Sequence, residues 1–158
     1  MTTLIKNQDV RTIAAGILAT RATAALPQTA TGNIFTVSGG RIMIVSLTGW
    51  VTTVMGATAT TLSVGLTPTV GTSSATSLAS ATAVTSKEVG THFSIGSTPG
   101  SALVVGSNAG APVQSTGHAA WVINTGSITV TTSASDTGSV QWDLIYIPLD
   151  NGAQVSPA

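Results

Sequence analysis

The sequence has 158 residues, a length that fits one domain or one domain with an additional arm. Five Lys and Arg residues balance five Asp and Glu residues, so the formal net charge is zero and only 6% of the residues are charged. This composition excludes the clustered basic surface of a nucleic-acid-binding protein and an acidic disordered tail, and the lack of Cys excludes disulfides and thiolate sites.

The first predicted element is a helix over residues 9–25, which Pro27 is expected to end. The apolar residues of this segment recur with the spacing of one helical face. They are Val10, Ile13, Ala14, Ile17 and Leu18. The helix either packs on its own domain or belongs to an arm, residues 1–31, that docks on a neighbouring subunit.

From residue 33 onward, apolar residues recur at every second position, which predicts β-strands separated by turns. Gly39 and Gly40 predict a two-residue hairpin. Residues 72–86 carry few large side chains and are expected to form a long loop or a weak edge strand. The strand candidates are 33–38, 41–54, 58–66, 89–96, 101–105 and 118–123, then a pair around 128–130 and 140–146.

This pattern predicts an all-β fold, an antiparallel β-sandwich or a jelly-roll-like barrel of about eight strands with an N-terminal helical arm. The β-sandwich domain is expected over residues 32–149. Residues 150–158 are expected to form a polar C-terminal tail. Trp142 and Tyr146 lie in an apolar alternation and are therefore assigned to the core.

The titratable residues form no pattern typical of a catalytic or metal site. His92 and His118 fall in different strand candidates, and their spacing does not suit a metal ion. Asp136 lies in a predicted turn, where Asp side chains bind backbone N–H groups. The sequence has no Gly-x-Ser-x-Gly nucleophile motif, no phosphate-binding loop and no apolar run that could span a bilayer. We therefore expect a non-enzymatic protein without cofactor or metal, and without nucleic-acid or membrane partners.

The surface is expected to be polar but almost uncharged, because Thr, Ser, Ala and Gly make up just over half of the chain. Such a surface resists association less than a charged one, so we expect copies of the chain or a partner to cover it. At the start of strand 41–54, apolar residues occupy both faces, so both faces are expected to be covered there. Trp50 interrupts the polar face of the same strand, and Trp is enriched at interfaces. The candidate interface residues are Val10, Arg11, Ile13, Ile17, Leu18, Arg21 and Trp50.

An Ala-rich N-terminal segment runs into LPQTATG at residues 26–32, and short strands rich in Gly, Ser and Thr follow. These are IFTVSGGR (34–41), SLTGWVTT (46–53), GSITV (126–130), GSVQW (138–142) and YIPLDNGA (146–153). In these segments the chain resembles the small virion structural proteins of tailed bacteriophages, of the head-decoration or minor capsid type. The resemblance implies a β-rich subunit on the capsid surface, present in many copies as a homotrimer and in contact with the major capsid protein.

Two alternative functions remain open from the sequence. One is a structural protein of the phage tail, neck or fibre base, which would share the same β-rich design. The other is a carbohydrate-binding adhesin module, which would present several exposed aromatic side chains beside polar partners.

Overall fold

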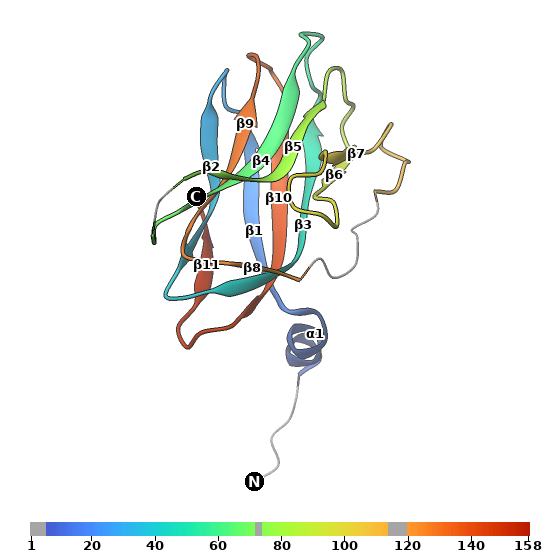
Figure 1. The fold of residues 1–158 in the computed structure, drawn as a ribbon. Coiled ribbons are helices and arrows are strands. Elements are labelled where there is room, and N and C mark those ends of the chain that lie inside the picture. The colour runs from blue at the N-terminus through green and yellow to red at the C-terminus, as the bar shows by residue number, and fades with distance from the viewer. Residues whose placement is uncertain (1–5, 72–73, 114–119) are drawn as a thin grey trace.

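The chain folds into a β-sandwich with one short helix at one end, in a computed structural model that describes residues 6–71, 74–113 and 120–158 (Figure 1). We call the end of the sandwich next to this helix its foot. The elements are α1 (Asn7–Ala15), β1 (Ile17–Ala25), β2 (Thr31–Ser38), β3 (Ile42–Thr53), β4 (Thr61–Pro68), β5 (Thr76–Ala83), β6 (His92–Ser94), β7 (Val104–Val105), β8 (Trp121–Ile123), β9 (Gly126–Thr132), β10 (Ser139–Pro148) and β11 (Gln154–Pro157).

Two antiparallel sheets make up the sandwich. The six-stranded sheet has the order β1-β10-β3-β6-β7, and β8 also pairs with β3. The five-stranded sheet has the order β11-β2-β9-β4-β5. The antiparallel sandwich predicted from the sequence is therefore confirmed. The stretch 72–86 contributes the edge strand β5, so the edge-strand interpretation holds for its described residues.

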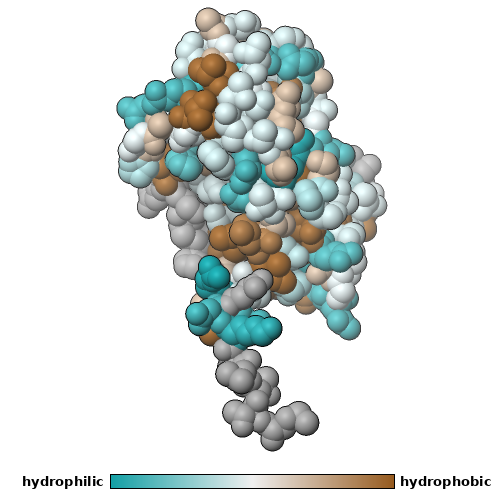
Figure 2. Space-filling model, turned by 180° about the vertical axis from the view of Figure 1, so that it is seen from behind, coloured by the Kyte–Doolittle hydropathy of each residue, from teal (hydrophilic) through white to brown (hydrophobic). Residues whose placement is uncertain are grey.

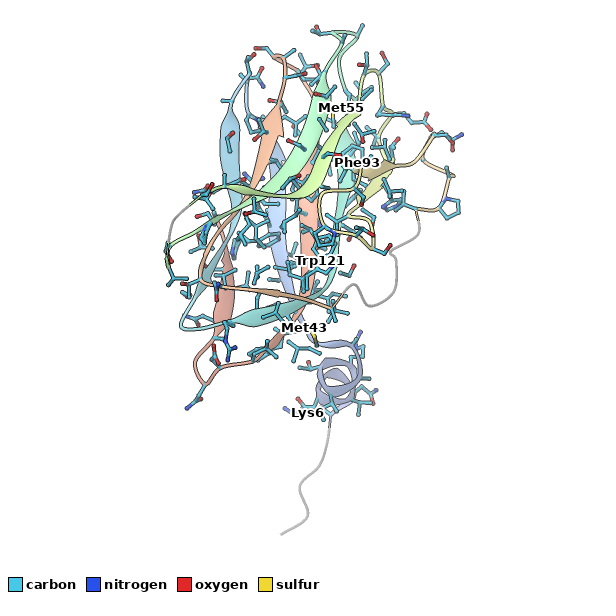
Figure 3. The ribbon with its side chains drawn as sticks, in the orientation of Figure 1. Lys6, Met43, Met55, Phe93 and Trp121 are labelled. Carbon is cyan, nitrogen blue, oxygen red and sulfur yellow. The ribbon has the colours of Figure 1, made fainter. Side chains whose placement is uncertain are left out.

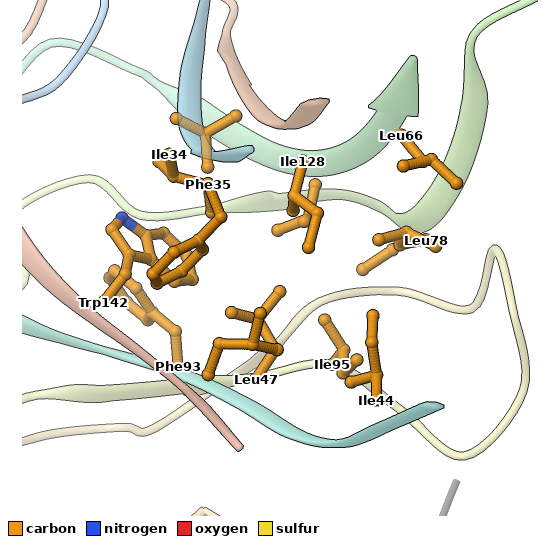
Figure 4. Close-up of a cluster of buried hydrophobic side chains, with 14 of the residues drawn as sticks. Ile34, Phe35, Ile44, Leu47, Leu66, Leu78, Phe93, Ile95, Ile128 and Trp142 are labelled. Atoms are coloured by element: carbon orange, nitrogen blue, oxygen red, sulfur yellow. The ribbon is translucent and has the colours of Figure 1, made fainter. Parts of the chain in front are cut away.

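The core fills the space between the two sheets. Along β10, each second side chain points inward and is buried, which confirms the assignment of Trp142 and Tyr146 to the core. Trp142 packs near Phe93, with 6.3 Å between the ring centroids (Figure 4). Gly49 of β3 lies against the Trp142 ring, where a Cβ atom would come within 2.9 Å of it. The large indole thus needs a residue without a side chain on the neighbouring strand.

The predicted helix over residues 9–25 is wrong beyond Ala15. The helix ends there, and Ile17–Ala25 form β1, which pairs with β10 at the edge of the six-stranded sheet. Gly16, between the two elements, has a φ of +99°, a conformation that favours glycine and ends the helix. Backbone pairing with β10 outweighs the local helical spacing, which Ile17 and Leu18 continue only by coincidence.

The predicted hairpin at Gly39 and Gly40 is also wrong. These residues connect β2 of one sheet to β3 of the other, so the turn crosses the sandwich instead of pairing the two strands. Gly39 has a φ of +74° and packs directly against the backbone of Gly152, which leaves no room for a Cβ atom. The two glycines do form a turn between two strands. The local pattern does not show that the second strand belongs to the other sheet.

Residues 150–158 are not only a polar tail. Gln154–Pro157 form β11, which pairs with β2 and lies at the edge of the five-stranded sheet. Arg21 of β1 donates from Nε to the carbonyl oxygen of Ala158 at 2.9 Å. This contact joins the edge strands of the two sheets.

Candidate assembly interface

Apolar side chains gather on the outer face of the six-stranded sheet, next to α1. In the strand register, Leu18 of β1 lies opposite Ile145 of β10. Ile147 of β10 lies opposite Met43 of β3, and Met43 opposite Val122 of β8. Leu18 is 61% exposed and Val122 is 56% exposed. We call these five residues the foot patch; brown side chains gather in this region in Figure 2, and Figure 3 places Met43 at the same end of the sandwich as α1.

The helix beside this patch has its own exposed apolar side chains. Val10 is 53% exposed and Ile13 is 78% exposed. Every described side chain of α1 is in fact exposed, so the helix buries none of them on its own sandwich. A hollow of about 610 Å³ lies between α1 and the edge of the patch. It is lined by Arg11, Thr12, Ala15, Gly16, Ile17, Leu18 and Ile145.

Four of the seven interface candidates lie on the helix or at the patch beside it. They are Val10, Arg11, Ile13 and Leu18. Ile17 also borders the hollow, but its side chain is partly buried and packs against the core. These positions are brought together because β1 follows α1 after a single residue.

The remaining two candidates lie elsewhere. Arg21 faces the space between the sheets and holds Ala158, as described above. Trp50 is half-buried on β3, where it pairs with Gln141 on one side and His92 on the other. Along β3 it lies two outward-facing rows from Ser46, which pairs with the patch residue Ile145. The structure therefore does not join Trp50 to the foot patch.

Four of the five foot-patch residues were not among the sequence candidates. A signal exists for three of them, because apolar residues run without alternation at Ile42–Val45 and at Leu144–Ile147. The first run predicts that both faces of its strand are covered. Its position beside the second run is not predicted, since only the sheet register places the two outward rows together.

Asp143 is a charged residue on the same outward face as the foot patch. It lies one outward row from Ile145 on β10, and its Oδ1 accepts a hydrogen bond from Thr20 Oγ1 at 2.6 Å. At the foot itself, Arg41 and Asp150 form a bidentate ion pair, with 2.7 Å between Nη2 and Oδ1 and 2.9 Å between Nε and Oδ2. Hydrogen bonds from Arg41 lower the pKa of Asp150 to about 2.

The described residues do not offer a catalytic constellation. No group of three or more His, Asp or Glu side chains among them could hold a metal ion. His92 is exposed, and His118 lies outside the described residues. Asp136 is buried, but its Oδ1 accepts hydrogen bonds from the backbone N–H groups of Gly56 at 3.0 Å and Gly138 at 2.7 Å. Its carboxylate thus holds two turns together, as the sequence predicted for a turn Asp.

Two smaller hollows differ from the one beside α1. One of about 210 Å³ lies at the open edge between β1 and β2 and includes Arg21 and Trp142 in its lining. The other, of about 200 Å³, lies over β9, β4 and β5 and is lined mainly by Thr, Ser, Gly and Ala, without an aromatic residue. Neither combines exposed aromatic rings with polar partners in the way that sugar stacking requires.

Comparisons with protein-family models, curated proteins and solved structures gave no match to this chain. In the described part of the chain, no helix has the length and apolar character needed to cross a membrane.

Proposed function

We propose that this protein is a non-enzymatic structural subunit of a bacteriophage particle, which decorates or cements the capsid. It does so through self-association and through contacts with the major capsid protein. The observation that carries this proposal is the exposed helix α1 beside the exposed foot patch, on a chain with very few charges. Buried interface cores are depleted of charged residues in the same way.

The geometry favours a binding role over a catalytic one. The large hydrophobic side chains that remain exposed are aliphatic. The buried carboxylate of Asp136 binds backbone N–H groups of two turns. A subunit on a particle needs complementary area and a rigid scaffold, and the sandwich provides that scaffold. Local threefold positions on an icosahedral shell favour a homotrimer.

The experiment is a binding assay on phage shells that lack this protein. Purified chain is added to the shells, and the bound fraction is measured by co-sedimentation. A variant that lacks residues 1–15 should lose binding but keep its β-sheet circular dichroism, because β1 begins only at Ile17. The deletion must end before Gly16, since removal of the whole predicted arm, residues 1–31, would also remove β1, an edge strand of the six-stranded sheet.

The position of the protein on the particle distinguishes a capsid role from a tail, neck or fibre-base role. Labelled protein on capsid shells supports the proposal, whereas label confined to tails or necks would support the tail, neck or fibre-base role. Binding of the 1–15 deletion at the level of the full chain would contradict the role of α1. Quenching of Trp fluorescence by a glycan would instead support an adhesin module.

A further inference from the structure

In this structure the helix α1 leaves the foot patch of its own molecule uncovered. Gly16 is the single residue between the helix and β1, and its φ of +99° sets the direction in which the helix leaves the sheet. The site is also tight, because a Cβ atom on Gly16 would lie 2.8 Å from the carbonyl oxygen of Tyr146. The hollow of about 610 Å³ between helix and sheet is the result of this geometry.

The helix and the foot patch match in length. Nine residues of α1 give an axis of about 13 Å at 1.5 Å per residue. The patch crosses β1, β10, β3 and β8, and three strand spacings of about 4.8 Å give a width of about 14 Å. A helix laid across the four strands would therefore span the patch, and Val10 and Ile13, about 4.5 Å apart along the helix axis, would contact the middle of it.

The two faces of α1 differ in their surroundings. Arg11, Thr12 and Ala15 line the hollow toward the sheet of their own molecule. Val10 and Ile13, three residues apart, share the opposite face of the helix and are 53% and 78% exposed. This apolar face therefore points away from its own foot patch and is available to the patch of another molecule.

We propose that α1 of one copy docks across the foot patch of the next copy, so that the copies form a closed ring. This inference deepens the self-association in the proposed function and rests on it. In a ring, each copy takes part in two identical contacts, giving its helix to one neighbour and its foot patch to the other. At one contact, the two apolar side chains of the helix and the five of the patch bury roughly 500 Å² over both partners. A standard interface buries about 1,600 Å² over both partners, so each contact is small and the closure of the ring, with two contacts per copy, must hold the copies together.

The absence of Cys from the sequence permits a direct test by disulfide trapping. One variant carries Ile13→Cys on the helix, and a second, affinity-tagged variant carries Val122→Cys on the patch. The two are mixed under mild oxidation, and the mixed disulfide is identified by its mass. The matched control replaces Val122→Cys by Val89→Cys, since Val89 is 52% exposed but lies between β5 and β6, outside the patch. We expect the patch pair to link at least about tenfold faster than the control pair.

A second measurement tests the same contact without a disulfide. Light scattering should show that Ile13→Asp lowers the molar mass to that of one chain, whereas Val89→Asp keeps the mass of the oligomer. Equal rates of disulfide formation for the patch and control pairs would overturn the proposal. So would an intramolecular disulfide in a monomeric chain that carries both Ile13→Cys and Val122→Cys, because α1 would then cover its own patch.

The outcomes separate this inference from the proposed function. A trapped ring that does not bind phage shells would leave the helix exchange intact and refute the capsid role. A monomeric protein whose Ile13→Asp variant loses shell binding would show that α1 docks on the shell, which refutes the exchange and keeps the capsid role.

Discussion

Asp136 is the clearest case of a single side chain that organises its surroundings. Its backbone N–H donates to Gln28 Oε1 at 3.1 Å, and its carbonyl oxygen accepts from Gln28 Nε2 at 2.8 Å. Its Oδ1 accepts from the N–H groups of Gly56 and Gly138. Its Oδ2 is buried and has no hydrogen-bond partner among the described residues. Asp136 thus joins three chain segments through its Oδ1 and its backbone groups, and Oδ2 takes no part in these contacts.

This arrangement predicts different effects for two substitutions of Asp136. Asp136→Ala leaves the buried N–H of Gly138 and the partly buried N–H of Gly56 without this acceptor, and should lower the free energy of unfolding by about 1–3 kcal/mol. Asp136→Asn keeps an oxygen acceptor and removes the buried charge, so its loss should be clearly smaller. Urea unfolding followed by Trp fluorescence measures both values. Equal losses for the two variants would show that the carboxylate charge, and not the acceptor, is what the turns require.

At the scale of elements, two connections at the foot pass from one sheet to the other and lie side by side. The β2–β3 connection contains Gly39 and Arg41, and the β10–β11 connection contains Asp150 and Gly152. The N–H of Leu149 donates to the carbonyl oxygen of Arg41 at 3.0 Å, and the N–H of Arg41 donates to Asp150 Oδ2 at 2.7 Å. The Arg41–Asp150 ion pair therefore joins both crossings.

The lowered pKa of Asp150 predicts how this contact depends on pH. Its folded pKa of about 2 lies below its ordinary value, so the ionised form stabilises the fold at neutral pH. This stabilisation is complete above about pH 4 and is lost as the pH falls toward 2. The difference in thermal midpoint between the natural chain and Asp150→Asn should therefore be constant at neutral pH, shrink between about pH 4 and pH 2, and vanish only below about pH 2.

The control for this prediction is the same substitution in an Arg41→Gln background. The pH-dependent difference should become smaller there but remain measurable, because the backbone N–H of residue 41 still binds the carboxylate. A difference that persists unchanged at pH 2 would contradict the assignment of the effect to Asp150 ionisation.

The elements also show how far sequence reasoning reaches. The recurrence of apolar residues at every second position predicts most strands and the inward face of β10. It does so because such alternation reflects burial of one face of a sheet. The helix end was missed because Ile17 and Leu18 continue the helical spacing, and only the pairing of Ile17–Ala25 with β10 shows that this segment is a strand. The short β11 was missed because Gln154–Pro157 carry no alternation, so the strand depends on pairing with β2. Of the candidate interface, the helix side was predicted, while most of the patch depends on a sheet register that no local pattern encodes.

At the scale of the whole molecule, the low charge is the property that distinguishes this chain from an ordinary soluble domain. Only 6% of its residues are charged, compared with about 25% in an average protein. Thr and Ser hydroxyls on the strands make the outer face of the five-stranded sheet polar, as in the hydrogen bond between Thr31 and Thr131 at 2.7 Å. The molecule therefore has little electrostatic repulsion to keep copies apart, and its exposed aliphatic side chains can associate.

This balance predicts that self-association is insensitive to salt. The proposed trimer has three times the chain mass of 15.6 kDa, and its core would consist of aliphatic contacts between α1 and the foot patch. Light scattering after size exclusion should give the same mass from about 0.05 M to about 1 M NaCl, because screening weakens exposed ion pairs but not apolar burial. A mass that falls at high salt would assign the association to charge pairs between copies, in which the exposed Arg11 of α1 would take part. In that case Arg11→Gln should dissociate the oligomer as effectively as Ile13→Asp, whereas a contact based on apolar burial predicts that Arg11→Gln leaves the mass unchanged.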